Sequence, residues 1–235
     1  MIQSPIDSRY QINDDGIWLK KEYVYSINDA VFTMYHHQRM IDVLNADVGH
    51  YAGLKNSVIG SCPQLFSKSY DNVYAFGGGL PKFETLLNTK KITILDGMAE
   101  RVYQQYLEQF RELYKYPGEL ELIQLIFDSN IISCFEFDKS KSTLFTFCHI
   151  LEHQSFEEHL AILEKLPKGI DVLVYGPNIS KCKDNNWIHI KEWIADHNTF
   201  IPYLKMKEII ENFGYTIYFS TEYSDDLLFY FNTGS

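Results

Sequence analysis

A run of three glycines is the first feature of this sequence that points to a binding site. Gly77 to Gly79 follow the apolar run Asn72–Phe76, which predicts a strand, and precede Leu80–Asn88, which predicts a short helix. Glycines let the backbone approach a ligand closely, and the start of a helix directs N–H groups at it. Asp96 follows Gly79 by 17 residues and ends the next predicted strand, where a carboxylate accepts hydrogen bonds from ribose hydroxyls. This spacing favours a ligand that contains a nucleoside.

A second group of chemically capable residues lies in the later half of the chain. His149, Glu152 and His153 follow a predicted strand end, and His197 lies beyond the next strand, so we expect the four side chains to converge. A histidine with a near-neutral pKa suits a general base, while imidazole and carboxylate together suit a metal ion. We name His149, His153 and His197 as candidate catalytic residues and assign no metal ligands.

The elements that must position these residues alternate between strand and helix. Apolar β-rich runs followed by helical patterns indicate a parallel sheet with crossover helices, and two final strands separated by a polar turn indicate an antiparallel hairpin. The predicted strands are Asn72–Phe76, Lys91–Leu95, one within Glu119–Phe127, Ser142–Cys148, Ile170–Tyr175, Tyr215–Phe219 and Leu227–Phe231. The longer predicted helices are Ala99–Tyr114, Phe156–Leu166 and Pro202–Phe213.

The first 70 residues differ from the rest. They are polar at first and then contain an amphipathic pattern from Asn28 to Leu44, with apolar residues at helical spacing. We therefore divide the chain into a helical N-terminal cap on the substrate side, residues 1–70, and an α/β domain, residues 71–235.

Composition limits the classes of partner. The chain has 235 residues, 46% of them hydrophobic, and a formal net charge of −10. Such a charge repels a phosphate backbone, so nucleic acid is a disfavoured partner, although a local basic patch would still suit a structured RNA. No apolar run approaches the roughly 20 residues of a membrane helix, and the four cysteines form no C-x-x-C pair. We expect a cytoplasmic protein with reduced thiols, no membrane partner and a small-molecule acceptor.

Three segments in order carry a resemblance to a known family. Thr146–Gly169 (TFCHILEHQSFEEHLAILEKLPKG), Val172–Asn178 (VLVYGPN) and Asp196–Ile217 (DHNTFIPYLKMKEIIENFGYTI) resemble the class I S-adenosylmethionine-dependent methyltransferases. The resemblance spans Asp71 to Phe231. It implies a Rossmann-like α/β sandwich of seven strands with a C-terminal antiparallel hairpin. It also implies S-adenosylmethionine as cofactor and methyl transfer to an oxygen, nitrogen or carbon nucleophile of a small or medium-sized acceptor.

The resemblance assigns roles to particular positions. The glycines would hold the methionine part of the cofactor, Asp96 the ribose, and the residues after the second and third strands the adenine, with Cys134–Asp138 as a competing position for the third-strand contact. The implied cofactor-binding residues are Gly77, Gly78, Gly79, Asp96, Gly97, Met98, Phe127, Asp128 and Cys148. In the same family Leu-Glu-His, here Leu151 to His153, is also a structural element, so a purely structural role for Glu152 and His153 stays open beside the base and metal roles.

Two departures from the family pattern keep other functions open. Ala75 stands where the family has an acid, and Pro81 aligns with its third glycine, so one alternative is a degenerate relative that binds or scaffolds without turnover. The other is a metal-assisted RNA 2′-O-methyltransferase, because Glu152 and His153 resemble part of the carboxylate-histidine set of such enzymes. His149 stands where that set has its first carboxylate.

Overall fold

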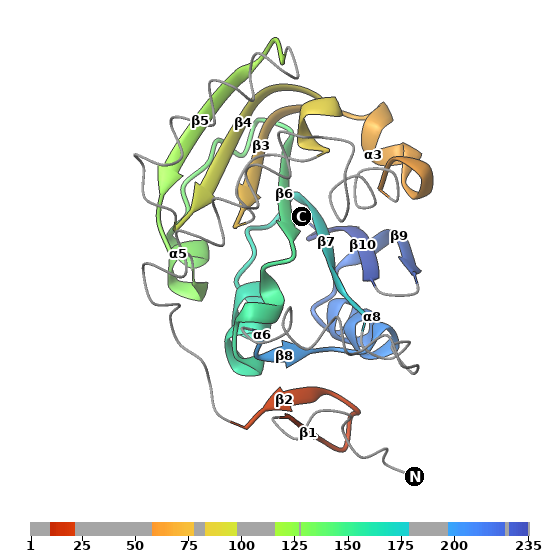
Figure 1. The fold of residues 1–235 in the computed structure, drawn as a ribbon. Helices are drawn as coiled ribbons and strands as arrows, with labels where there is room; N and C mark the ends of the chain where they lie inside the picture. The colour runs from red at the N-terminus through yellow and green to blue at the C-terminus, as the bar shows by residue number, and fades with distance from the viewer. Residues whose placement is uncertain are drawn as a thin grey trace.

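The protein is built on one twisted sheet of seven strands (Figure 1). A computed structural model describes residues 10–21, 58–77, 83–97, 116–126, 128–178, 197–223 and 226–234. The strand order is β5-β4-β3-β6-β7-β10-β9. Their bounds are β3 Ser69–Phe76, β4 Asn88–Asp96, β5 Glu119–Gln124, β6 Thr143–Cys148, β7 Asp171–Pro177, β9 Thr216–Glu222 and β10 Asp226–Asn232. The predicted seven-stranded fold is confirmed.

The direction of the strands fixes where a ligand can bind. The neighbouring strands β5, β4, β3, β6 and β7 run parallel to one another. β10 pairs antiparallel with both β7 and β9. β3 lies between β4 and β6, so the chain builds the sheet first to one side of β3 and then to the other. In such sheets ligands bind beyond the carboxyl ends of the strands at this reversal.

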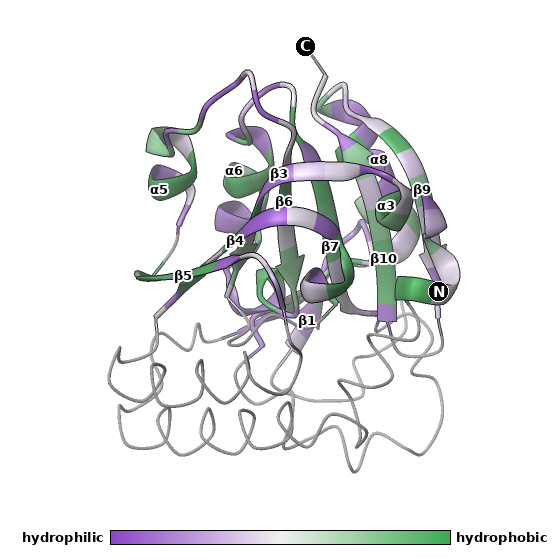
Figure 2. Cartoon of the chain, turned by 90° about the horizontal axis from the view of Figure 1, so that it is seen from above, coloured by the Kyte–Doolittle hydropathy of each residue, from purple (hydrophilic) through white to green (hydrophobic). Residues whose placement is uncertain are grey.

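The central strands are apolar because both of their faces are covered. All six residues of β6 are buried, and alternate side chains belong to two cores, Leu144 to one and Phe145 to the other. Strands buried on both faces carry continuous rather than alternating apolar runs. Figure 2 shows this hydrophobic colouring along central strands such as β7 and β10.

Helices cover the two faces unequally within the described residues. α6 (Phe156–Glu164) and α8 (Tyr203–Asn212) bury Ile162, Leu163, Met206 and Ile210 in the Phe145 core. The short helix α3 (Pro63–Ser67) packs on the other face through Leu65. Ser155 is the N-cap of α6, and its side chain accepts the Glu158 N–H, a hydrogen bond that contributes about 1 kcal/mol.

A bulge interrupts the edge strand β9. Tyr230 of β10 pairs with Phe219, and the next residue, Phe231, pairs with Ile217, so the register skips Tyr218. Tyr218 is 49% exposed. The extra residue bends the strand and breaks its regular ladder there.

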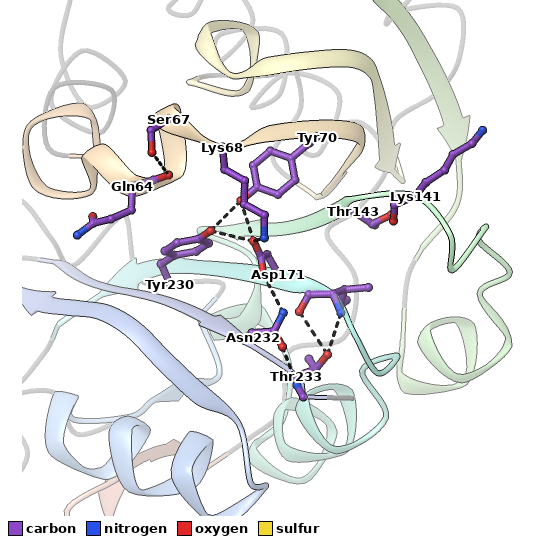
Figure 3. A network of polar contacts seen from close by, with 12 residues as sticks. Gln64, Ser67, Lys68, Tyr70, Lys141, Thr143, Asp171, Tyr230, Asn232 and Thr233 are labelled. Carbon is purple, nitrogen blue, oxygen red and sulfur yellow. Dashed lines mark hydrogen bonds and ion pairs between the residues drawn. The ribbon is translucent and has the colours of Figure 1, made fainter.

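A polar network lies at the amino-terminal ends of the parallel strands (Figure 3). The buried Asp171 carboxylate at the start of β7 accepts from Lys68 Nζ (2.6 Å), Tyr70 Oη (2.9 Å), Tyr230 Oη (2.8 Å) and Asn232 Nδ2 (2.8 Å). Burial raises the pKa of both tyrosines, so both remain hydrogen-bond donors. The network joins β3, β7 and β10 at the end of the sheet far from the reversal.

Some local structure differs from the prediction. The segment predicted as a helix over Leu80–Asn88 has in its described part a 3-10 turn, η1 (Glu84–Leu86), and Asn88 already begins β4. The turn is short because Leu87 adopts an extended conformation. A short helix that was not predicted, α5 (Ser129–Cys134), follows β5.

The N-terminal region contributes a small second sheet. β1 (Tyr10–Ile12) and β2 (Trp18–Lys20) form a hairpin, and β2 pairs with β8 (Thr199–Phe200). The predicted helices over Asn28–Leu44 and Ala99–Tyr114 lie outside the described residues, so the N-terminal helical cap stays a prediction. No helix among the described residues has the length and apolar character needed to cross a membrane.

Candidate cofactor site and histidine cluster

Gly77 ends the strand at the reversal point and needs to be glycine. Its φ is +53°, in the left-handed region that side chains disfavour, and its N–H donates to the Leu95 carbonyl at 2.8 Å. A Cβ here would overlap the side chain of Ile150, which follows β6. The close approach predicted for this turn therefore involves a side chain of the protein itself. Gly78, Gly79 and Pro81 lie outside the described residues.

Asp96 stands at the end of β4, where the sequence placed it. Its side chain is buried, and its backbone carbonyl accepts the Leu125 N–H at 2.9 Å, which ties the ends of β4 and β5 together. The carboxylate thus lies at the carboxyl edge of the sheet, one strand away from Gly77. This is the arrangement in which an acid can accept two ribose hydroxyls.

Ile126 is a candidate contact that the sequence analysis missed. A Cβ on Gly97 would lie 3.1 Å from Cγ1 of Ile126, so the two residues are neighbours beyond the strand ends. The Ile126 side chain is 76% exposed, which offers an apolar surface beside Asp96. The prediction placed the third-strand end near Phe127 and Asp128, whereas β5 ends at Gln124. Aliphatic residues directly after a strand were the signal that could have found it.

The remaining predicted cofactor residues have mixed surroundings. Asp128 Oδ1 accepts the Ile131 N–H at 2.8 Å and caps α5, so its side chain already serves a helix start. Cys148 is buried at the end of β6. Met98 and Phe127 lie outside the described residues. Their contacts with a cofactor stay predictions.

A buried carboxylate stands near the position that lacks the family's acid. Ala75 pairs with Thr146 across β3 and β6, so the two side chains share a face of the sheet. The Thr146 hydroxyl donates to Glu84 Oε1 at 2.9 Å, and Glu84 is buried. The small side chain of Ala75 thus lies beside a threonine that holds an acid from η1. No local sequence pattern predicts this contact, because it depends on how the chain crosses the sheet.

His149 lies in a strained turn between two carboxylates. Its φ is +53°, and its N–H donates to the Tyr175 carbonyl at 2.8 Å. Nδ1 lies 3.2 Å from Glu152 Oε1, and Nε2 lies 3.4 Å from Asp226 Oδ1. The Tyr175 hydroxyl donates to the other oxygen of Asp226 at 2.7 Å. Because β10 is antiparallel, its first residue Asp226 reaches the edge at which the parallel strands end.

Glu152, His153 and His197 come together as the spacing led us to expect. One ligand atom from each lies within 4.8 Å of the others, and Glu152 Oε1 is 3.9 Å from His197 Nε2. The rings of His153 and His197 meet edge to face, with centroids 4.6 Å apart. A carboxylate oxygen and two imidazole nitrogens at these separations could bind one divalent cation.

Hydrogen bonds to backbone carbonyls, donated by Asn198 and Tyr10, hold this cluster in place. The Asn198 N–H donates to the Glu152 carbonyl and its Nδ2 donates to the His153 carbonyl, both at 2.7 Å. The Tyr10 hydroxyl of β1 donates to the His197 carbonyl at 2.7 Å. The N-terminal hairpin therefore supports the histidine cluster directly.

Exposure separates the three predicted catalytic histidines. His149 and His197 are buried, and His153 is partly exposed. Of the three, His153 is thus the one whose ring an acceptor could reach without rearrangement of the core.

Comparison with known proteins places the fold. No family model matches the sequence, and a search of curated proteins finds no match. An O-methyltransferase family protein from Burkholderia thailandensis has a TM-score of 0.55 and 11% identity, with 88% of this chain and 60% of that chain covered. A DhpI complex with SAH has a TM-score of 0.54 and 14% identity over 86% of this chain and 95% of that one.

A third solved structure is the small RNA methyltransferase HEN1. Its TM-score is 0.52 at 15% identity, and the alignment covers 76% of this chain but 25% of that chain. The present chain therefore spans less than two thirds of the length of two of these three structures. The three likenesses agree on one architecture, and the chain has the fold of the class I S-adenosylmethionine-dependent methyltransferases.

Proposed function

We propose that the protein transfers a methyl group from S-adenosylmethionine to an oxygen, nitrogen or carbon nucleophile of a small or medium-sized acceptor. The observation that carries the proposal is the placement of Gly77 and Asp96 on adjacent strands at the sheet reversal, in a methyltransferase fold. The residues present suit the cofactor: a glycine with positive φ directly after β3, a buried acid for the ribose, and the exposed Ile126 side chain for a flat apolar ring.

The cofactor supplies an electrophilic methyl group on a sulfonium. Asp96 would fix the ribose by accepting its hydroxyls, and the turn that Gly77 begins would hold the methionine part beyond the end of β3. Orientation of this kind is a large part of catalysis in an in-line displacement, because the nucleophile, the methyl carbon and the sulfur must be collinear.

His153 is the base that the geometry favours for a hydroxyl acceptor. For such an acceptor, a ring nitrogen of His153 would accept the hydroxyl proton as the methyl group is transferred. The partly exposed ring can meet the acceptor, while His197 at its edge and Glu152 nearby hold its environment polar. A carbon or nitrogen acceptor that must lose a proton would pass it to the same ring. An acceptor with no proton to lose would need no base.

Calorimetric titration with S-adenosylhomocysteine tests the cofactor part of the proposal. We expect micromolar affinity for the wild type and at least tenfold weaker binding for Asp96→Ala, which corresponds to about 1.4 kcal/mol or more. Glu208→Gln, an exposed change on α8, is the matched control and should bind as the wild type does. Absence of binding by the wild type would overturn the proposal and favour the degenerate, non-enzymatic alternative.

A second candidate function rests on the ligand atoms of Glu152, His153 and His197. These three residues fit a divalent cation, and one structural neighbour is a small RNA methyltransferase. In a metal-assisted RNA 2′-O-methyltransferase the cation would lower the pKa of the 2′-hydroxyl and orient it. His149 contributes an imidazole beside Glu152 rather than a further carboxylate.

Elemental analysis separates the two candidates. Protein purified without chelator should contain about one equivalent of a transition metal under the second candidate, and Glu152→Gln should lose it, whereas Glu158→Gln should retain it. A metal-free wild type that also fails to bind added Mn²⁺ or Co²⁺ would exclude the metal-assisted function.

A further inference from the structure

A buried histidine, His159, lines the same cavity as Glu152 of the cluster. His159 of α6 is buried, and neither of its ring nitrogens has a partner among the residues that the structure describes. A buried polar group without a partner costs roughly 1–3 kcal/mol, so its position calls for a physical explanation. Desolvation lowers the pKa of His159 to about 3, so the ring is neutral and offers one donor and one acceptor.

A small cavity connects this histidine with the candidate site. Its lining includes His159, Glu152, Gly176 and Thr199, together with apolar residues of β7, β8 and α8. The centre of a water molecule can occupy about 20 Å³ of this cavity. One bound water needs roughly 10–15 Å³ of such space and two to four polar partners.

The carboxylate of Glu152 turns one oxygen toward the cluster and the other toward this cavity. Oε1 is the atom that lies near His149 and His197. Oε2 lies against Gly176, since a Cβ built there would be 3.7 Å from it, and Gly176 is part of the cavity lining. The Thr199 hydroxyl donates to the Gln154 carbonyl, so its oxygen can still accept.

We propose that this cavity is a binding site for one structural water, which links the imidazole of His159 to Oε2 of Glu152. The water donates to the carboxylate and pairs with a ring nitrogen, with Thr199 as a third partner. His159 thereby acts as a positioning residue: it fixes the rotation of the Glu152 carboxylate and so the aim of Oε1 at the histidine cluster. The proposal concerns the site described above, but it holds whether or not that site transfers a methyl group.

A double-mutant cycle in urea unfolding at pH 7.5 tests the link. We expect the effects of His159→Leu and Glu152→Met on the unfolding constant to be coupled by at least tenfold. The control pair is His159→Leu with Glu84→Met, since Glu84 is equally buried but its partner is Thr146 on another part of the sheet. This pair should be additive to within about twofold. Additivity in both pairs would overturn the proposal.

Conservative replacement gives a readout that simple packing would not move. At least one of His159→Asn and His159→Gln, which keep a donor and an acceptor, should unfold at higher urea than His159→Leu. If His159→Leu is instead more stable than the wild type and both amides, the ring has no water partner and the proposal fails, because removing an unpaired polar group stabilises.

A crystal structure of the wild type gives the direct answer and does not depend on whether the variants fold. Ordered density within hydrogen-bond distance of both His159 and Glu152 Oε2 supports the proposal, and a cavity without density overturns it. None of these measurements involves methyl transfer or cofactor binding. A failure of the proposed function would therefore leave this result unaffected, and the reverse also holds.

Discussion

Nδ1 of His149 lies 3.2 Å from Oε1 of Glu152, three residues further along the chain, although the His149 backbone has a φ of +53°. A left-handed conformation costs a non-glycine residue about 1–2 kcal/mol. The turn is held by the two carboxylates on the ring and by the His149 N–H bond to Tyr175. Strain of this kind persists only where surrounding contacts over-determine it, and it clusters at functional sites.

The strain at His149 predicts an order of stability between two truncations. His149→Ala and His149→Gly both remove the ring and its carboxylate contacts, but glycine accepts the left-handed turn and alanine does not. We expect the glycine variant to be more stable by about 1 kcal/mol, measured as the free energy of unfolding in urea. Equal stability of the two variants would show that the turn relaxes once the ring is gone.

Because Ile150 lies so close to Gly77, we expect a substitution of Ile150 to recover part of the stability that Gly77→Ala loses. Gly77→Ala should lower the free energy of unfolding by about 1–3 kcal/mol, because the new methyl group meets Ile150 and the backbone has positive φ. In the double variant, Ile150→Ala should recover the loss of unfolding free energy that is due to overlap. The loss that is due to the positive φ of residue 77 should remain. Thermal denaturation of the four proteins measures both parts, and a double variant no better than Gly77→Ala would argue against the overlap.

The network around Asp171 predicts a stability effect that leaves the site intact. Tyr230→Phe removes one donor to the buried carboxylate and should cost about 1–3 kcal/mol in urea unfolding. The exposed Tyr218→Phe is the control and should change stability by less than about 0.5 kcal/mol. Cofactor affinity should be unchanged in both, since the network lies at the amino-terminal edge of the sheet. A loss of affinity in Tyr230→Phe alone would reveal coupling between the two edges.

His159 predicts a dependence of stability on pH. Its pKa is lowered to about 3 in the folded protein by burial, against an ordinary value of 6.5. Between these values the unfolded chain binds a proton that the folded chain does not, so stability falls as the pH falls below about 6.5. From pH 6.5 to 5 this group alone should remove about 2 kcal/mol. His159→Gln should show a shallower loss by that amount in urea titrations at the two pH values, and parallel curves would contradict the assignment.

Long apolar runs made most of the sheet predictable. Strands buried on both faces, such as Thr143–Cys148, stand out in a sequence because no polar face interrupts them. The three-residue strands of the N-terminal hairpin were missed because alternation cannot be recognised over so short a stretch. The bounds near Gln124 were shifted because the strand is followed by further apolar residues.

The candidate site was predictable only where its residues follow strand ends in sequence. Parallel strands bring their carboxyl ends to one edge, so Gly77, Asp96, Glu152 and His153 could be placed there. Asp226 and Glu84 reach their positions through an antiparallel strand and a crossing of the sheet face, which no local pattern encodes. In the sequence His159 looks like any other residue of an amphipathic helix, and the lack of a partner for its ring nitrogens among the described residues depends wholly on tertiary packing.

The skipped residue Tyr218 has a consequence beyond the shape of β9. An edge strand exposes a row of N–H and C=O groups on which a strand from another molecule can form a continuous ladder. At Tyr218 the spacing of that row is broken and the strand bends, so a foreign strand cannot stay in register along the whole of Thr216–Glu222. The bulge therefore protects this margin of the sheet against aggregation by edge-to-edge pairing.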